Sequence, residues 1–521
     1  MALTFGRPLA ANAADFVVNS QADQADANPG DGVCRTSANT CTLRAALQEA
    51  NALPGADLIS LPAGTYAIQI PTLSADLDTT GDWDIHAPVT IAGAGLGVTI
   101  LDAGNPLPGA DPTARGMDRL IEVHPTAGNV TIRDLTLREG YSVADGGAIQ
   151  NWSPGLLRLE RVHVRDSYAG GAGGGLNNAN PAEYEWVVEP LAPPKSGRVE
   201  IMASTFSGNA AADSGAAINN AAAGSVTIMA GSSIINNPGL MVPDPAQVID
   251  PFDPEPIEYV PGPGVYWPGA GAIGNQATID LPGTIRIVHS TVSGNFATAN
   301  GAGVLNDGAG LVVIENSTIA DNHTPAGGGG LYTNGGDVTI TGSTLSGNVA
   351  ADGGGIYSNG AVDTLGLRPH FALSGSTISE NTAHAGGGGM HNGGEAHLAI
   401  TDVSFSNNVA HDAGGGLSSA DRSSVSILRT TFSGNVTNGE GGGAWFASER
   451  LVTIADSVFD GNAAGVPEPG DVLDPSSANI AGGGGMYTEG GPVTITGSTF
   501  ANNTATETGG GLSLSTVTQM C

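Results

Sequence analysis

Short stretches in which apolar and polar residues alternate recur along most of the chain. Val338-Thr339-Ile340, Val452-Thr453-Ile454 and Val493-Thr494-Ile495 each place β-branched side chains in a pattern typical of a short β-strand. Helical periodicity is missing from these stretches, and the runs of three glycines that follow them do not favour a helix. The pattern therefore predicts many short strands separated by glycine-containing turns.

Two short signatures alternate from about residue 140 onward. The first is Ser-Thr-apolar-x-x-Asn, as in Ser343 to Asn348, and the second is a glycine cluster followed by one apolar residue, as in Gly353 to Ile356. The signature asparagines stand at positions 209, 237, 295, 322, 348, 381, 408, 435, 462 and 503. Uninterrupted neighbours are 26 to 28 residues apart, so each repeat is one physical unit of about 27 residues.

A unit of two or three short strands separated by glycine turns, repeated many times, is one coil of a parallel β-helix. We therefore predict an all-β fold, a right-handed single-stranded parallel β-helix of the pectin-lyase-like kind, over residues 57–521. Glycine would occupy the corners of coils that stack at ~4.8 Å, and each asparagine side chain would hydrogen-bond its counterpart one coil away. The apolar residues expected to form an inward ladder stand at positions 149, 176, 218, 304, 331, 356, 390, 417 and 512.

Residues 14–56 do not follow the repeat and are predicted to form an N-terminal cap. Asp15 to Val18 is a candidate first strand, and Thr42 to Asn51 places four apolar side chains on one face of a short helix. Thr42 is the expected N-cap of that helix. Since a solenoid exposes the apolar end of its core, we expect the helix to cover that end.

The cap sequence resembles a known family. Cys34, the segment Cys41 to Ala46, Glu49 to Asn51 and the turn Leu61 to Tyr66 are similar to the CSLREA domain that opens many bacterial surface β-helix proteins, although two of its six letters differ. The later repeats resemble the GGA(I/L/V) and FxxN motifs of chlamydial polymorphic outer-membrane proteins, which are surface adhesins; Gly146 to Ile149 is a full match. The resemblance implies a β-helix at a bacterial surface and an adhesive function.

The cysteines and the two ends of the chain bear on its compartment. Cys34 and Cys41 suit a local disulfide in an oxidising compartment, with two reduced thiols as the alternative. No second cysteine pair exists, so no zinc site is expected at these cysteines. We interpret residues 1–13 as a shortened signal peptide, because Ala11 to Ala13 suits cleavage but no long apolar core precedes it. The chain ends just after a glycine cluster, and we expect a further region beyond it. The predicted location is extracellular or the outer-membrane surface of a bacterium.

Composition and charge exclude several classes of partner. One lysine and 16 arginines stand against 50 acidic residues, and the resulting net charge of −33 disfavours nucleic acids and anionic membranes. No run of 18 apolar residues is present, so we expect no transmembrane helix in this chain.

The sequence gives little support to an enzymatic function. Calcium-dependent lyases of this fold need converging carboxylates and an Arg or Lys base, and the hydrolases need neighbouring aspartates. The chain has no Asp-Asp pair, no Gly-His-Gly and no Arg-x-Lys, so we assign no catalytic residue and no metal site. We predict an adhesin or recognition rod without catalysis. The alternatives are a polysaccharide-active enzyme resembling a pectate lyase, and a purely structural surface spacer.

Binding residues are expected in two places. The residue after each ladder position should point outward, where a column of aromatic rings would stack either on sugars or on one another. This column contains Tyr332, Tyr357, His391, Ser418, Trp445 and Tyr487. Loop insertions carry either recognition or proline-rich decoration, and are predicted at 179–196, 238–268, 360–370 and 463–481. Their exposed aromatic candidates are Tyr184, Trp186, Tyr259, Tyr266 and Trp267. The expected partner is a glycan, or a protein on a host or neighbouring cell.

Two minor sites complete the prediction. His384 and His411 occupy the same slot on adjacent coils and, with Asp412, form either a metal or pH-sensing site or a solvated turn. Four aspartates precede glycine turns and are candidates for weak Ca²⁺ binding, namely Asp145, Asp213, Asp352 and Asp412. We expect no other cofactor.

Overall fold

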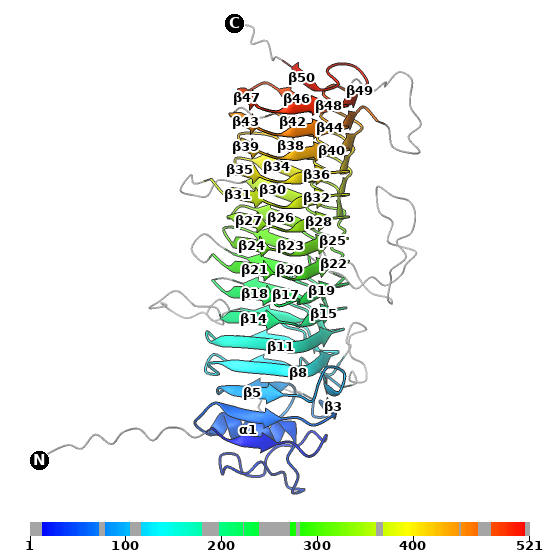
Figure 1. The fold of residues 1–521 in the computed structure, drawn as a ribbon. Coiled ribbons are helices and arrows are strands. Elements are labelled where there is room, and N and C mark those ends of the chain that lie inside the picture. Colours follow the sequence, from blue (N-terminus) through cyan, green and yellow to red (C-terminus); the bar gives the residue numbers. More distant parts are fainter. Residues whose placement is uncertain are drawn as a thin grey trace, which may run out of the picture.

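The chain forms a rod of stacked coils with the helix at its N-terminal end (Figure 1). The computed structural model describes residues 13–71, 79–104, 116–179, 197–221, 223–238, 271–277, 282–360, 368–447, 450–466 and 481–515. Strands in one coil pair in parallel with the equivalent strands of the next, as Leu331 with Ile356 and Ile356 with Met390. The predicted parallel β-helix is therefore confirmed.

One face of the rod is a sheet of 14 strands, one for each coil. These strands are β4 (Trp83–Ile85), β7 (Ile121–Val123), β10 (Ile149–Asn151), β13 (Leu176–Asn178), β17 (Ile218–Ala221), β20 (Ile273–Gln276), β23 (Val304–Asp307), β26 (Leu331–Asn334), β30 (Ile356–Gly360), β34 (Met390–Gly394), β38 (Leu417–Ser419), β42 (Ala444–Phe446), β46 (Met486–Glu489) and β50 (Leu512–Ser515).

A 27-stranded sheet forms the other two faces as two strand columns, which the long strands β8 (Val130–Arg138) and β11 (Leu156–Arg165) join. The first column contains β1 (Asp15–Val17), β2 (Asp57–Ser60), β5 (Val89–Ala92), β14 (Arg198–Met202), β18 (Ser225–Met229), β21 (Thr284–Val288), β24 (Leu311–Glu315), β27 (Val338–Thr341), β31 (His370–Ser374), β35 (His397–Thr401), β39 (Ser424–Leu428), β43 (Val452–Ala455) and β47 (Val493–Thr496). The second column contains β3 (Gly64–Ala67), β6 (Thr99–Asp102), β15 (Thr205–Ser207), β19 (Ser233–Ile235), β22 (Thr291–Ser293), β25 (Thr318–Ala320), β28 (Thr344–Ser346), β32 (Thr377–Ser379), β36 (Ser404–Ser406), β40 (Thr431–Ser433), β44 (Val458–Asp460) and β48 (Thr499–Ala501).

Two small sheets of two-residue strands complete the coils after the asparagine corner. They contain β9 (Tyr141–Ser142), β12 (Tyr168–Ala169) and β16 (Ala210–Ala211), and β29 (Val349–Ala350), β33 (Thr382–Ala383), β37 (Val409–Ala410), β41 (Val436–Thr437), β45 (Ala463–Ala464) and β49 (Thr504–Ala505).

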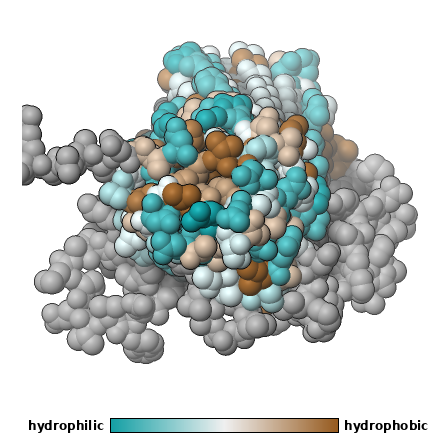
Figure 2. Space-filling model, turned by 90° about the horizontal axis from the view of Figure 1, so that it is seen from below, coloured by the Kyte–Doolittle hydropathy of each residue, from teal (hydrophilic) through white to brown (hydrophobic). Residues whose placement is uncertain are grey.

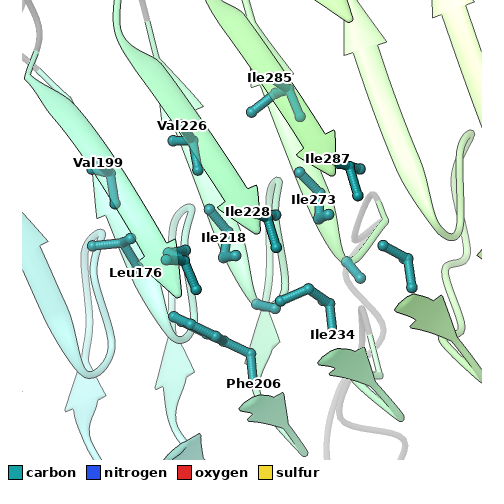
Figure 3. Close-up of a cluster of buried hydrophobic side chains, with 14 of the residues drawn as sticks. Leu176, Val199, Phe206, Ile218, Val226, Ile228, Ile234, Ile273, Ile285 and Ile287 are labelled. Carbon is teal, nitrogen blue, oxygen red and sulfur yellow. The ribbon is translucent and has the colours of Figure 1, made fainter. Parts of the chain in front are cut away.

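The interior of the rod is a continuous stack of aliphatic and aromatic side chains (Figure 3). The predicted ladder is confirmed, because its members from Ile149 to Leu417 are fully buried and Leu512 packs against the same core at the last described coil. The phenylalanines of the FxxN motif also stack inside: the ring centroids of Phe405 and Phe432 are 4.8 Å apart, and those of Phe432 and Phe459 are 4.6 Å apart.

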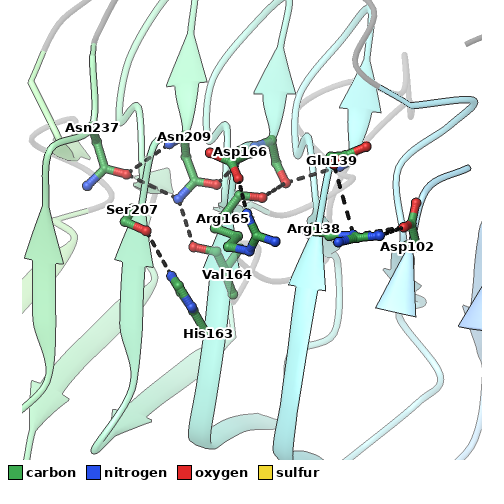
Figure 4. Close-up of polar contacts among 12 residues, drawn as sticks. Asp102, Arg138, Glu139, His163, Val164, Arg165, Asp166, Ser207, Asn209 and Asn237 are labelled. Carbon is green, nitrogen blue, oxygen red and sulfur yellow. Dashed lines mark hydrogen bonds and ion pairs between the residues drawn. The ribbon is translucent and has the colours of Figure 1, made fainter. Parts of the chain in front are cut away.

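The predicted amide ladder is also confirmed. Asn209 Nδ2 donates to Asn237 Oδ1 at 3.1 Å and to the carbonyl oxygen of Val164 at 3.0 Å (Figure 4). The same contact recurs from coil to coil as far as Asn462 and Asn503, at 2.9 Å. A second buried ladder was not predicted; it lies two residues after the aliphatic ladder and contains Asn151, Asn178, Asn220, Asn275 and Asn306.

Glycine occupies one corner of each coil for two physical reasons. Gly353 has a φ of +59°, a conformation that side chains with a Cβ rarely adopt. A Cβ on the next residue, Gly354, would lie 2.4 Å from the Thr382 carbonyl oxygen of the adjacent coil. The prediction that glycine makes the corners is incomplete, however, because acidic residues such as Glu380 and Asp402 take a positive φ at two other corners.

The N-terminal cap contains the helix α1 (Leu43–Ala52), and Thr42 is its N-cap as predicted, with Oγ1 accepting from the Ala45 amide. Residues of the CSLREA-like segment hold the preceding loop: Arg44 makes a buried ion pair with Asp23, and Glu49 accepts from the Gly30 amide. The apolar face of α1 joins the core of the rod. Figure 2 looks onto this end of the rod, where hydrophilic and hydrophobic residues are intermixed.

Cys34 and Cys41 form the predicted disulfide within the cap. Among the described residues, no helix has the length and apolar character needed to cross a membrane. The predicted insertions lie mostly outside the described residues, which exclude 180–196, 239–270, 361–367 and 467–480. The domain boundaries at residues 13 and 56 remain predictions.

Candidate binding face on the 14-stranded sheet

The residue after each ladder position forms a column along the outer face of the 14-stranded sheet, and strand register fixes its members. We call this set the outer column. In chain order it contains Asp84, Glu122, Gln150, Asn177, Asn219, Gly274, Leu305, Tyr332, Tyr357, His391, Ser418, Trp445, Tyr487 and Ser513. Its N-terminal half is acidic and amide-bearing, and its C-terminal half is mainly aromatic.

The rings of the aromatic half stack on one another. The centroids of Tyr332 and Tyr357 are 5.1 Å apart at an interplanar angle of 10°, and those of Tyr357 and His391 are 5.0 Å apart at 14°. Because these ring faces cover one another along the rod axis, a ligand beside the sheet meets ring edges and polar atoms. The sequence left two arrangements open, in which the rings stack on one another or on sugars. The geometry favours the first, because the stacked ring faces are not free to contact a sugar.

The aromatic half is interrupted once. Ser418 stands between His391 and Trp445 and is buried, and Tyr487 is only 9% exposed. Burial raises the pKa of the nearby Glu440 carboxyl above its usual value, while the Tyr487 hydroxyl and the Trp445 indole act in the opposite direction.

Polar groups line the stacked tyrosines. Asn359 Nδ2 donates to Asn334 Oδ1 at 3.0 Å, and Asn334 Nδ2 donates to Asp307 Oδ1 at 3.2 Å. Burial, with a smaller contribution from Asp307, raises the pKa of the Tyr332 hydroxyl, which therefore stays protonated at neutral pH. This edge of the column offers amide, carboxylate and hydroxyl groups at the spacing of the coils.

His391 ends the stack as a neutral ring at neutral pH. Burial lowers the pKa of its imidazole, although the negative charges of Asp352 and Asp421 act in the opposite direction. Its Nδ1 lies 3.9 Å from Asp352 Oδ1 and has no hydrogen-bond partner. The acidic groups near the aromatic half make this surface unfavourable for a polyanion in the absence of a bridging cation.

Other predicted binding residues fall elsewhere. Tyr184, Trp186, Tyr259, Tyr266 and Trp267 lie outside the described residues.

The predicted histidine slot is present. His411 follows His384 one coil on, with its amide donating to the Ala383 carbonyl oxygen. His411 Nδ1 lies 2.9 Å from Asp412 Oδ1 on an exposed turn.

The N-terminal half of the outer column carries a cluster that the sequence reasoning missed. In-register pairing of β4 with β7 places Asp84 beside Glu122, and His86 and His124 come directly after the last residues of these two strands. The ring centroids of His86 and His124 are 3.8 Å apart. The two segments read Trp-Asp-Ile-His and Ile-Glu-Val-His, a repeated pattern that would have revealed the cluster.

This cluster has the donor atoms that bind a metal ion. One ligand atom from each of Asp84, His86 and His124 lies within 4.8 Å of the other two, and it is the one such group found among the described residues. His124 Nε2 lies 2.9 Å from Asp84 Oδ1 and 3.6 Å from Glu122 Oε1. Arg119 partly balances the acids, with Nη1 2.6 Å from Glu122 Oε2 and Nε 3.4 Å from Asp82 Oδ2.

Comparisons with known proteins agree with the fold. A family model described as a right-handed beta helix region matches residues 302–519. No curated protein sequence matches the chain.

Similar solved structures share little sequence with this chain. The A-module of mannuronan C-5 epimerase AlgE6 from Azotobacter vinelandii is 13% identical over 88% of this chain and 93% of its own, with a TM-score of 0.40. The catalytic unit of a GH87 α-1,3-glucanase from Streptomyces thermodiastaticus is 12% identical over 96% of this chain and 70% of its own, with a TM-score of 0.42. PfbA, a surface adhesin of Streptococcus pneumoniae, is 12% identical over 86% of this chain and 87% of its own, with a TM-score of 0.31. At these identities and scores, none of the three bears on function. The fold of this chain is a right-handed parallel β-helix, as its repeats predicted.

Proposed function

We propose that this chain is a recognition rod of an exported bacterial protein, and that it binds an extended, uncharged glycan along the aromatic half of the outer column. The observation that supports this proposal is the register of that half: β26, β30, β34, β38, β42 and β46 each present their outer-column residue at the same position of the coil. A surface that repeats at about 4.8 Å along one axis suits a ligand that is itself a linear repeat.

The chemistry of this face selects the class of ligand. Tyrosine hydroxyls and the amides of Asn334 and Asn359 can donate to and accept from sugar hydroxyls. Tyr and Trp supply contact area at a low cost in conformational entropy. The net charge of −33 disfavours an acidic polysaccharide, so we expect a neutral one.

Two observations support export and a location outside the cell. The Cys34–Cys41 disulfide is typical of a protein that folds in an oxidising compartment. The cap resembles the CSLREA domain of bacterial surface proteins, and the repeats resemble those of polymorphic outer-membrane adhesins.

A glycan array probed with the full chain tests the proposal. We expect binding to one class of neutral polysaccharide. The Tyr332→Ala/Tyr357→Ala variant should lose about 5-fold to 150-fold in affinity, since two aromatic contacts of about 0.5–1.5 kcal/mol each are removed.

The matched control is Tyr141→Ala/Tyr168→Ala. It removes another stacked tyrosine pair, with centroids 5.8 Å apart on β9 and β12, away from the 14-stranded sheet. Equal loss in both variants, or binding unchanged in the first, contradicts the proposed face. Turnover of the glycan, detected as new reducing ends or ultraviolet-absorbing unsaturated ends, would instead identify a polysaccharide-active enzyme.

A further inference from the structure

We propose that Asp84, His86 and His124 form a binding site for a divalent transition-metal ion, represented here by Zn²⁺. The site lies at the N-terminal end of the outer column, on β4 and β7 and the residues that follow them, and it does not depend on glycan binding. From the sequence, none of these three residues was named as a metal ligand, and the pairing of β4 with β7 is what brings their side chains together.

The Asp84 carboxylate is the first reason to infer a metal. Its side chain is 4% exposed, and its Oδ1 lies 2.9 Å from His124 Nε2. Its Oδ2 is buried without a hydrogen-bond partner. A buried carboxylate oxygen without a partner is costly, and a cation bound at this carboxylate would satisfy it.

The local charge is the second reason. Asp84 and Glu122 stand directly opposite each other on paired strands, an arrangement that is destabilising for like charges. Asp82 adds a third carboxylate, and Arg119 pairs with both Asp82 and Glu122. The guanidinium of Arg44 also reaches the Asp82 carbonyl oxygen, at 3.0 Å, but its charge is paired with Asp23. A bound divalent cation would offset the excess negative charge that remains.

The cap holds the ligands in position. Asn51, on α1, donates through Nδ2 to the Asp84 carbonyl oxygen at 2.9 Å and accepts through Oδ1 from the His86 amide at 2.8 Å. These two hydrogen bonds fix the segment that carries two of the three ligands. Little reorganisation is therefore needed when the ion binds.

The donor set indicates which ions suit the site. Two imidazoles and one carboxylate suit zinc and related transition metals, whereas Ca²⁺ and Mg²⁺ prefer oxygen ligands. Three protein ligands leave a coordination position for water or for an oxygen of a bound ligand. Glu122, 3.6 Å from His124 Nε2, is positioned to orient that ring or to join the ion.

Isothermal titration calorimetry with ZnCl₂ at pH 7.5 tests the site, using the metal-stripped full chain without a histidine tag. We expect one ion per chain and an affinity loss of more than about 100-fold in Asp84→Asn and in His86→Ala/His124→Ala, because losing even an outer partner of a ligand costs 10–100-fold. Adding excess CaCl₂ should not displace the zinc.

The chain contains a matched control pair. His370 and His397 also lie on adjacent coils, with ring centroids 5.3 Å apart, and they belong to no metal-binding group among the described residues. The His370→Ala/His397→Ala variant should bind zinc like the unmodified chain.

A second readout separates loss of the site from loss of the fold. Co²⁺ bound by the unmodified chain should give visible d–d absorption bands that are absent in Asp84→Asn, while the far-ultraviolet circular dichroism of both stays that of a β-helix. The proposal is overturned if zinc binds with less than one equivalent, or if the His86/His124 variant binds it as tightly as the control.

Discussion

The buried hydrogen bonds of the amide ladder should contribute to the stability of each coil. The substitution Asn408→Ala, which removes one asparagine of the ladder, tests this contribution. Asn408 is fully buried. Its Oδ1 accepts from the Asn381 amide at 3.1 Å and from Asn381 Nδ2 at 2.9 Å. Its Nδ2 donates to the Ile378 carbonyl oxygen and to Asn435 Oδ1, both at 2.9 Å.

Removing this side chain leaves two buried donors of Asn381 without their acceptor. An unsatisfied buried polar group costs about 1–3 kcal/mol, so we expect a loss of about 2–6 kcal/mol in the free energy of opening this coil. Asn381 Nδ2 keeps its second bond, to the Leu345 carbonyl oxygen, which limits the loss.

Hydrogen exchange monitored by mass spectrometry is the appropriate assay, because a long repeat array does not unfold as a single two-state unit. Protection of the Asn381 amide should fall about 30-fold for each 2 kcal/mol lost, while distant coils stay unchanged. Asn408→Ser should lose less, since Ser167 occupies the equivalent slot and its Oγ accepts from the Gly140 amide at 3.1 Å.

The control for this substitution is Asn407→Gly, at the exposed neighbouring residue. Asn407 has a positive φ of 54°, and Gly434 occupies the same slot one coil later with a φ of 62°. If Asn408→Ala leaves protection at the level of Asn407→Gly, the ladder contributes no net stability and the reasoning is wrong.

Two further predictions concern the corners and the pH dependence. Gly354→Ala should lower the melting temperature by more than Gly461→Ala. The new Cβ at position 354 would lie 2.4 and 2.6 Å from two backbone oxygens, whereas at position 461 there is open space within 4 Å and only the strain of a φ of +66° remains. Equal shifts of the two variants in differential scanning calorimetry would show that the contacts at Gly354 do not decide its identity. Burial, together with the charge of nearby Arg165, lowers the pKa of His163 below 6.5. Below about pH 6.5 the unfolded chain therefore binds a proton at this histidine that the folded chain does not bind, and the free energy of unfolding falls as the pH drops. Unfolding measured from pH 7.5 to 5 should show less of this fall in His163→Gln, and an identical profile in both chains would contradict the assignment.

The repeat made most of the fold predictable. The spacing of the asparagines and glycine clusters requires equivalent residues to stack, so the apolar ladder, the amide ladder and the glycine corner follow from sequence alone. The corners at Glu380 and Asp402 could not be predicted from the sequence. These two residues adopt the left-handed conformation, but Glu and Asp occur in many other conformations and so do not mark a corner as glycine does.

The candidate sites were less predictable for two physical reasons. The outer column follows from strand alternation, but only the three-dimensional packing shows that the faces of Tyr332 and Tyr357 cover each other. The Asp84 cluster lies in coils whose equivalent residues, Asp84 and Glu122, are 38 positions apart, so the 27-residue period does not reveal them.

The central claim is that an extended face of the rod, rather than a local pocket, recognises a linear glycan. The most direct measurement is calorimetric binding of a length series of oligosaccharides from the polysaccharide class that the array identifies. We predict that affinity rises with each added sugar until the chain spans the strands from β26 to β46. A single sugar that binds as tightly as the long chain would contradict the claim.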